Sequence, residues 1–284
     1  KVSFNMSLKM NKPLVSVDWL YKNSGNEKLI ILDCTIRKVT SMDVIPDEKT
    51  QIKDALFFDI ENTFSDTQSA FPNTVLSPEE FEGKAQELGI CQDAIVICYD
   101  DLGTYASPRV WWMFQLMGFK NIAVLDGGFP AWKAAEFPIE TSKKRQLKRG
   151  DFKTIYQPEK LRDTQGVVKA LGNTDILIID ARSEGRFNGI TPEPRKDLKS
   201  GHMPNAVSLP FGEVQQNGKM KSTAELVHIF NNFRKHKEII FTCGSGITAA
   251  ILNLGATIAE VEHTAVYDGS WTEWASTKGT SIVP

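Results

Sequence analysis

The chain lacks a long hydrophobic run and an excess of charge of one sign, and each absence excludes a class of protein. No apolar run approaches the roughly 18 residues that a membrane span needs, so we expect no membrane protein. Lys and Arg number 33 against 35 Asp and Glu, which argues against a protein that binds nucleic acid along its phosphates. With 41% hydrophobic and 24% charged residues, the 284-residue chain is too apolar to be largely disordered.

Cysteine is also scarce, and its positions show no metal-ligand spacing. The four cysteines are Cys34, Cys91, Cys98 and Cys243. Four in a chain of this length do not make a disulfide-bonded scaffold, and free thiols are typical of a reducing compartment. The apolar stretch at 14–17 is too short for the core of a secretion signal. We therefore expect a cytoplasmic protein without a bound metal.

Two pairs of similar segments lie almost the same distance apart, which indicates an internal repeat. The apolar runs at 29–33 and 176–180 each end in Asp and are 147 positions apart. The segments 126–132 and 268–274 both begin with Asp-Gly and end in Trp, and they are 142 positions apart. The chain is therefore expected to hold two copies of one fold, each of about 140 residues.

Short apolar runs and helical patterns alternate in both halves. The apolar runs show no polar alternation, as in parallel strands that are buried on both faces. The predicted strands and helices fall at 94–99, 107–117 and 122–125 in the first half and at 238–242, 248–259 and 264–267 in the second. This order predicts an α/β fold with two tandem domains, each an open, mainly parallel sheet with helices on both faces.

A charged segment separates the two halves. Residues 143–149 read Lys-Lys-Arg-Gln-Leu-Lys-Arg and have little to bury. A solvated connector is a better interpretation of this run than a nucleic-acid contact. We therefore divide the chain into an N-terminal domain at 1–142, a linker at 143–157 and a C-terminal domain at 158–284.

The halves differ at the end of a buried strand, where ligands bind in folds of this kind. The second half has the loop Cys243-Gly244-Ser245-Gly246-Ile247-Thr248, whereas the first has Tyr-Asp-Asp-Leu-Gly-Thr at 99–104. Two glycines let the loop curl and turn its N–H groups inward, and the next helix adds its positive end. These surroundings favour a thiolate, which is a good nucleophile and can carry a second sulfur. The alternative is a buried structural cysteine.

These features resemble those of tandem-domain rhodanese-type sulfurtransferases over nearly the whole chain. The resemblance rests on the paired Asp-Gly-x-x-x-x-Trp endings, on Gly-His-Met-Pro-Asn-Ala at 201–206 and on the cysteine loop. This loop resembles that of the 3-mercaptopyruvate subfamily, whereas thiosulfate-preferring relatives carry basic residues after the cysteine. The resemblance implies that Cys243 takes sulfur from 3-mercaptopyruvate as a persulfide and releases pyruvate. The sulfur would then pass to thioredoxin, to a small thiol or to cyanide, without a cofactor.

The resemblance also assigns substrate-binding residues around Cys243. Arg186 and Arg195 would hold the carboxylate and keto oxygens of the substrate, because guanidinium groups pair well with such oxygens. Arg182, which precedes them, is interpreted as structural. The loop residues expected to line the same site are Gly244, Gly246, Ile247 and Thr248.

The proton relay that the resemblance implies is incomplete in this sequence. Ser245 would move protons together with Asp59 and a histidine from the first domain. All four histidines lie in the second half, and the position of the relay histidine falls near Asn73 or Thr74. Asp59 could instead cap a helix that begins near Glu61, so both roles of Asp59 stay open.

Three other functions are weighed against this one. A thiosulfate:cyanide sulfurtransferase would use the same nucleophile. A phosphatase loop needs an arginine six positions after its cysteine, and Ala249 stands there. A non-catalytic module that binds a protein partner is the third alternative, and the first half alone fits that description.

Overall fold

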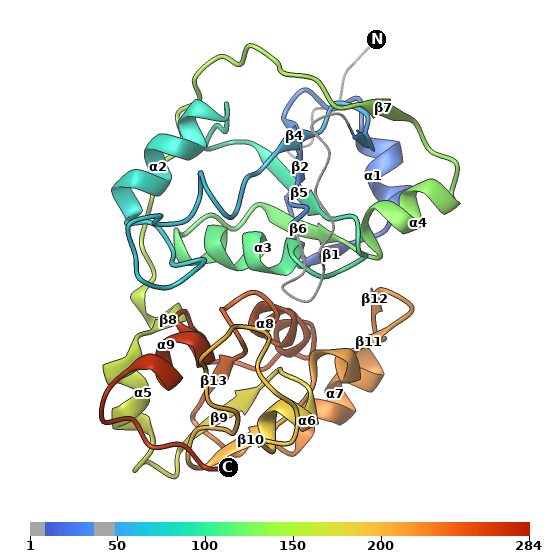
Figure 1. The fold of residues 1–284 in the computed structure, drawn as a ribbon. Coiled ribbons are helices and arrows are strands. Elements are labelled where there is room, and N and C mark those ends of the chain that lie inside the picture. The colour runs from blue at the N-terminus through green and yellow to red at the C-terminus, as the bar shows by residue number, and fades with distance from the viewer. Residues whose placement is uncertain (1–8, 37–48) are drawn as a thin grey trace.

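The computed structural model describes residues 9–36 and 49–284, and its two halves each contain a five-stranded parallel sheet. In Figure 1 the first half, in blue to green, lies above the second half, in yellow to red. The strand order is β1-β6-β5-β2-β4 in the first sheet and β10-β9-β13-β14-β8 in the second. In sheet order, the strands are β1 (Leu14–Val15), β6 (Ile122–Leu125), β5 (Ile95–Tyr99), β2 (Leu29–Asp33) and β4 (Leu56–Phe57), then β10 (Ala206–Ser208), β9 (Ile176–Asp180), β13 (Glu238–Thr242), β14 (Thr264–Tyr267) and β8 (Leu161–Arg162).

Helices cover both faces of each sheet. The helices of the first half are α1 (Val17–Asn23), α2 (Pro78–Glu87), α3 (Ser107–Leu116) and α4 (Gly128–Ala134). Those of the second half are α5 (Thr164–Ala170), α6 (Glu184–Phe187), α7 (Thr223–Asn231), α8 (Ala249–Ile258) and α9 (Ser270–Ser276). Two antiparallel pairs complete the fold, β3 (Thr50–Ile52) with β7 (Ile139–Thr141) and β11 (Gln215–Gln216) with β12 (Lys219–Met220). The two short 3-10 helices span Pro158–Lys160 and Phe211–Val214.

The apolar strands bury both of their faces, which explains why their sequences show no alternation. On β2, Ile31 packs with α1 and α4, whereas Leu32 packs with α2 and α3. In the second half Ile240 faces α5 and α9, and Phe241 faces α7 and α8. The predicted α/β architecture with two mainly parallel sheets is thus confirmed, and the six predicted strands agree with the observed ones to within one residue.

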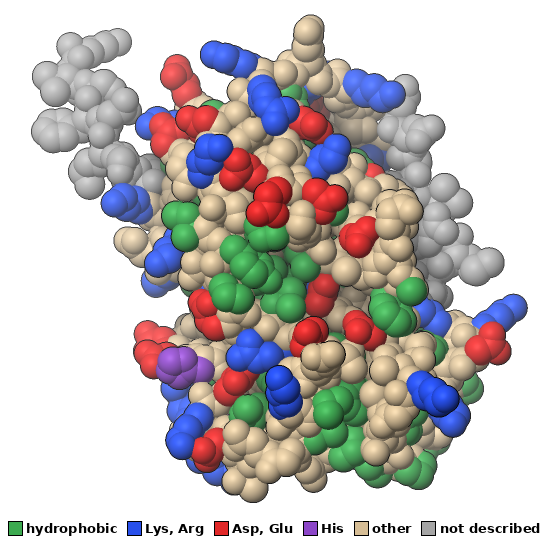
Figure 2. Space-filling view, turned by 90° about the vertical axis from the view of Figure 1, so that its left-hand side faces the viewer, with side chains coloured by type: hydrophobic (Ala, Val, Ile, Leu, Met, Phe, Trp, Pro, Cys, Tyr) green, Lys and Arg blue, Asp and Glu red, His purple; other side chains and the backbone are tan. Residues whose placement is uncertain are grey.

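The two halves share one hydrophobic core. α3 packs against α8 across the boundary, and a single buried cluster contains residues of both sheets. The face in Figure 2 carries Lys and Arg among Asp and Glu, with a hydrophobic group between them. Within the described ranges, no helix combines the length and the hydropathy that crossing a bilayer requires.

The predicted linker differs along its length. Most side chains of 143–149 are exposed, in agreement with a solvated connector. From residue 150 onward the chain pairs with the first half: the Gly150 N–H donates to the Gln86 carbonyl at 2.8 Å. Phe152 is buried among the aromatic rings of that half. The division at 142 and 157 stays a proposal.

Candidate active site

Cys243 follows the last residue of β13 and lies at the base of its loop. Its N–H donates to Ser270 Oγ at 3.1 Å, and its carbonyl accepts from Trp271 N at 2.9 Å. The Sγ accepts a hydrogen bond from the Gly246 N–H at 3.2 Å. The side chain is 1% exposed. The loop therefore curls over the sulfur, as the glycine pattern predicts.

Both glycines of the loop lie in tight surroundings, and the position of Gly246 would not fit a side chain. Gly246 has a φ of +83°, and a Cβ there would lie 2.7 Å from the Asp268 carbonyl oxygen. A Cβ on Gly244 would lie 3.0 Å from Arg186 Nη2 and 3.8 Å from Arg195 Nη1. Both predicted substrate arginines thus come close to the residue that follows Cys243.

The equivalent loop of the first half shows what this backbone shape binds. β5 and β13 pair in the same register with β2 and β9, so that Asp100 follows β5 as Cys243 follows β13. One Asp100 oxygen accepts from the N–H groups of Tyr105, Ala106 and Ser107 and from Ser107 Oγ, and the other accepts from Leu102 N. The first loop therefore encloses a carboxylate, as expected of an anion-binding turn before a helix.

The second loop follows its strand at the equivalent place and holds no carboxylate. The residues equivalent to three of the Asp100 donors are Ser245, Thr248 and Ala249. Among the residues that the structure describes, their N–H groups have no hydrogen-bond acceptor. Buried N–H groups normally find a partner. An anion carried by Cys243 is a partner that fits them.

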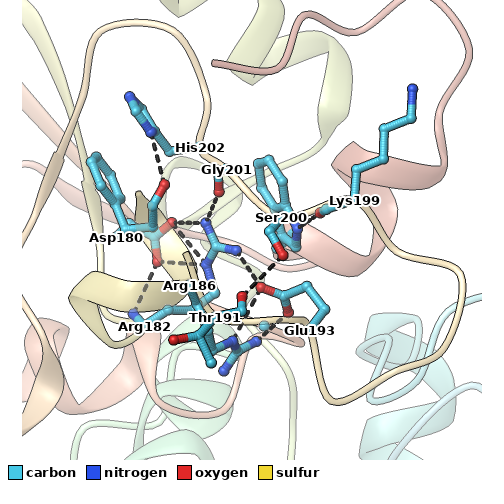
Figure 3. Close-up of polar contacts among 12 residues, drawn as sticks. Asp180, Arg182, Arg186, Thr191, Glu193, Lys199, Ser200, Gly201 and His202 are labelled. Atoms are coloured by element: carbon cyan, nitrogen blue, oxygen red, sulfur yellow. Dashed lines mark hydrogen bonds and ion pairs between the residues drawn. The ribbon is translucent and has the colours of Figure 1, made fainter. Parts of the chain in front are cut away.

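The arginines of the site are held by a chain of ion pairs (Figure 3). Arg182 pairs with Asp180 through Nε at 3.0 Å and Nη2 at 2.6 Å, and it stacks over Trp271 at 4.2 Å. Glu193 accepts from Arg182 Nη1 at 2.8 Å and from Arg186 Nη2 at 2.5 Å. Burial lowers the pKa of Arg182, but Asp180 and Glu193 outweigh it and hold that pKa above its usual value. Arg182 is fully buried, in agreement with a structural role.

Arg195 and Tyr105 complete the group of polar side chains near the sulfur. Burial and the charge of Arg186 lower the pKa of Arg195, while the nearby Cys243 opposes this change. Tyr105 comes from the first half, and burial together with Cys243 raises its pKa to about 12. The phenol of Tyr105 therefore keeps its proton at neutral pH. Because Cys243, Arg186 and Arg195 all influence it, this side chain borders the site.

A fully buried arginine of the first half reaches the cysteine loop. Arg109 Nη2 donates to Asp268 Oδ1 at 2.6 Å and to the Asn73 carbonyl at 2.7 Å, and Nη1 donates to the Gly246 carbonyl at 3.4 Å. Its guanidinium lies 4.6 Å from the Trp112 ring centroid. A buried charge is stable only when it is paired and hydrogen-bonded. Arg109 thus ties the loop to the first half.

Asn73 makes the contact that the family resemblance reserves for a histidine. Its Nδ2 donates to Ser245 Oγ at 3.1 Å and lies 3.4 Å from the Ser245 carbonyl. Asn73 has a φ of +60°, a conformation that Asn tolerates better than most residues. An amide cannot exchange a proton near neutral pH, so Asn73 orients the serine hydroxyl but does not titrate.

Asp59 is engaged elsewhere. Its carboxylate accepts from the Asn62 N–H at 3.0 Å and from Asn62 Nδ2 at 3.1 and 3.2 Å. These contacts close a turn, and among the described residues no helix begins near Glu61, so the predicted helix cap is wrong. In the described part of the chain, no hydrogen bond joins Asp59 to Ser245 or to Asn73. Its catalytic role stays a prediction.

No catalytic or substrate-binding role was predicted for Arg109, Glu193 or Tyr105. Arg109 lies between apolar residues at the start of a helix, and a charge in such a place needs a buried partner. Glu193 lies between two prolines, two residues before Arg195, where its charge opposes that of the arginine. These two local signals are visible in the sequence, but the partners are not.

Comparison with known proteins agrees with this geometry. The rhodanese-like domain family matches residues 16–135 and 163–277. The chain is 33% identical to 3-mercaptopyruvate sulfurtransferase of Escherichia coli K12 over 95% of this chain and 97% of that protein. It is also 33% identical to thiosulfate sulfurtransferase of Rattus norvegicus, over 93% and 92%.

A solved structure shows the same fold. The 3-mercaptopyruvate sulfotransferase SseA from Escherichia coli superposes with a TM-score of 0.82 at 32% identity, covering 92% of this chain and 99% of that one. The similarity covers both halves, and it agrees with the two parallel sheets and the cysteine loop described above. This chain belongs to the rhodanese-like family.

Proposed function

We propose that the protein is a 3-mercaptopyruvate sulfurtransferase that carries sulfur as a persulfide on Cys243. One observation carries the proposal: the Cys243 sulfur accepts the Gly246 N–H inside its loop, and Arg186 and Arg195 approach the next residue. A nucleophile, an anion-binding loop and two carboxylate-binding cations therefore lie together. The E. coli and mammalian relatives that bear the same enzyme name support this choice of donor.

The first step forms the persulfide. The Cys243 thiolate attacks the thiol sulfur of 3-mercaptopyruvate, an S–S bond forms, and the S–C bond breaks with its electron pair passing to carbon. The leaving group is the enolate of pyruvate, whose charge is spread onto the keto oxygen. The proton of the former thiol moves to the enolate carbon. Pyruvate leaves, and the persulfide anion stays on Cys243.

The second step returns the enzyme to its starting state. An acceptor thiolate attacks the outer sulfur, the S–S bond breaks, and Cys243 becomes a thiolate again. Thioredoxin or a small thiol would serve as the acceptor in a reducing cytoplasm, and cyanide would serve in an assay. The acceptor and the cytoplasmic location are part of the proposal and rest on the chemistry of the persulfide and on the cysteine content.

Apart from Asp59, each predicted site residue has a place in this scheme. Arg186 and Arg195 bind the carboxylate and the developing enolate oxygen. Ser245, held by Asn73, donates a hydrogen bond to the reacting groups. Gly244, Gly246, Ile247 and Thr248 build the loop. Its N–H groups and the N-terminal end of α8 stabilise the persulfide anion.

Thiosulfate is the alternative donor. The rat thiosulfate sulfurtransferase is as similar in identity as the bacterial mercaptopyruvate enzyme, so the percentage alone does not choose. The loop does offer a reason for the choice. Gly244 and Ser245 add no positive charge beside Cys243, and a dianion would need more positive charge than a monoanion.

The test is a pyruvate burst without any sulfur acceptor. Mixing the protein with 3-mercaptopyruvate should release one pyruvate per chain and then stop, because the persulfide cannot be discharged. Adding cyanide should restart turnover. Cys243→Ser should abolish the burst, whereas Cys91→Ser, which changes a half-buried cysteine elsewhere, should keep it. Absence of a burst in the unmodified protein, or its survival in Cys243→Ser, would contradict the proposal.

A further inference from the structure

Glu193 lies at the centre of the arginine cluster and binds the proposed substrate arginine in the absence of substrate. Its carboxylate accepts from Arg186 through Nε at 3.1 Å and through Nη2 at 2.5 Å. The side chain of Glu193 is 2% exposed, whereas that of Arg186 is 20% exposed. Figure 3 shows the carboxylate between the two guanidinium groups. Glu193 therefore keeps two Arg186 donors occupied from the buried side.

The position of Glu193 is fixed from behind. Arg182 donates to Glu193 Oε1 and is itself fully buried, with a bidentate bond to Asp180 and a bond to the Gly201 carbonyl at 2.7 Å. Because Asp180 and Arg182 neutralise each other, the negative charge of Glu193 is available to offset the positive charge of Arg186. It is therefore part of a rigid ion chain that ends at Arg186.

The charges at the loop follow from these pairs. Arg186 and Arg195 both approach Gly244, and Glu193 bears on both of them. Arg109, on the other side of the loop, is paired with Asp268. Tyr105 stays neutral at physiological pH. The two arginines and Glu193 together carry one net positive charge, and the Cys243 thiolate adds a negative charge beside them, so each further negative charge on a ligand lacks a partner.

We infer that Glu193 is a specificity-determining residue, which favours sulfur donors with one negative charge over donors with two. The inference rests on the proposed function for its choice of donors. 3-Mercaptopyruvate brings one carboxylate and a neutral thiol, whereas thiosulfate is a dianion. The second charge of thiosulfate is left without a partner in a half-buried site, and that is costly. Glu193 acts through its bonds to Arg186 and through the electrostatic field of its own carboxylate, without contacting the reacting sulfur.

The main experiment measures the ratio of kcat/KM for thiosulfate to that for 3-mercaptopyruvate. Glu193→Gln removes the negative charge and should raise this ratio about ten-fold or more, because thiosulfate brings one more negative charge for the carboxylate to repel. Glu193→Asp keeps the charge but shortens the side chain, so both donors should lose activity together. Glu184→Gln removes an exposed charge from α6, the helix that carries Arg186, and should leave both values unchanged.

A second measurement uses the unmodified protein and does not depend on how Glu193→Gln folds. Sulfate and methanesulfonate have similar tetrahedral shapes but carry two charges and one. As competitive inhibitors of sulfur transfer, methanesulfonate should bind at least as tightly as sulfate, and the order should reverse in Glu193→Gln. Tighter binding of sulfate to the unmodified protein would overturn the inference, as would an unchanged donor ratio in Glu193→Gln.

Failure of the proposed function can be distinguished from failure of the inference about Glu193. A protein that 3-mercaptopyruvate does not load with sulfur would lack the proposed activity. The two inhibitors would still compete with any donor that does load Cys243. The role of Glu193 can then be tested by the order of sulfate and methanesulfonate alone.

Discussion

The two halves use one loop shape for two purposes. In the first half the residue after the buried strand is Asp100, and its carboxylate accepts five hydrogen bonds from the turn and from Ser107. In the second half the same place holds Cys243, whose sulfur accepts one, from Gly246. The first loop is filled by the carboxylate of its own aspartate, and we propose that the persulfide of Cys243 takes the equivalent place in the second.

Reciprocal hydrogen bonds also join the two halves. Asp268, in the second half, accepts from Val75 N at 2.9 Å, and Asp126, in the first, accepts from Met220 N at 3.0 Å. These contacts repeat the internal symmetry, but Arg109 breaks it. The residue at the equivalent place on α8 is Leu252, which is buried without a charge. The first half therefore gives the cysteine loop a support that it does not receive in return.

The largest effect is expected when the second loop is converted into the first. Cys243→Asp should abolish sulfur transfer, at least about 1,000-fold, because the nucleophile is lost. The new carboxylate should also accept hydrogen bonds from the N–H groups of Ser245, Thr248 and Ala249, which are equivalent to donors of Asp100 in the first half. Urea unfolding should therefore show Cys243→Asp to be more stable than the equally inactive Cys243→Ser. If Cys243→Asp were the less stable variant, the two loops would not be equivalent.

The second prediction concerns the asymmetric support. Arg109→Met should lower the free energy of unfolding by about 3–5 kcal/mol, because it leaves the Asp268 carboxylate buried without its cation. It should also lower kcat, since the carbonyl of Gly246 loses its donor. In a double-mutant cycle with Asp268→Asn, much of the lost stability should return. Additive losses in that cycle would show that the two side chains are not coupled.

The third prediction tests whether the first loop is structural. Asp100→Asn places an amide against N–H donors and should cost about 2–3 kcal/mol of folding free energy. Thermal or urea unfolding measures this loss. If the first half is inactive as predicted, kcat/KM should change by less than about three-fold in the folded protein. A much larger fall in kcat/KM would mean that the first loop takes part in catalysis.

The smallest expected effect is on kcat/KM, and it distinguishes Asn73 from Asp59 in the first half. Asn73→Ala removes a hydrogen bond to Ser245 Oγ, which is worth about 1 kcal/mol, or about a five-fold fall in kcat/KM. Asp59→Asn, whose partner is Asn62, serves as the control and should change kcat/KM by less than about two-fold. Steady-state kinetics with 3-mercaptopyruvate compares them. If Asp59→Asn has the larger effect, Asp59 has the catalytic role that the family resemblance assigns.

Local patterns account for what the sequence could predict. The strands are apolar runs bounded by turns, and the cysteine loop is marked by Gly244 and Gly246 together with the helix that follows. The contacts that hold the site are not local. Asn73 meets Ser245 across 172 positions, and Arg109 meets Asp268 across 159. An alignment of the two halves would have placed Asp100 opposite Cys243, because their strands share one register.

The most direct test of the account is the mass of the intact protein after exposure to 3-mercaptopyruvate. The unmodified chain and Cys91→Ser should each gain one sulfur atom, and dithiothreitol should remove it. Cys243→Ser and Cys243→Asp should gain none. An added sulfur that persists when Cys243 is replaced would contradict the assignment of this residue as the sulfur carrier.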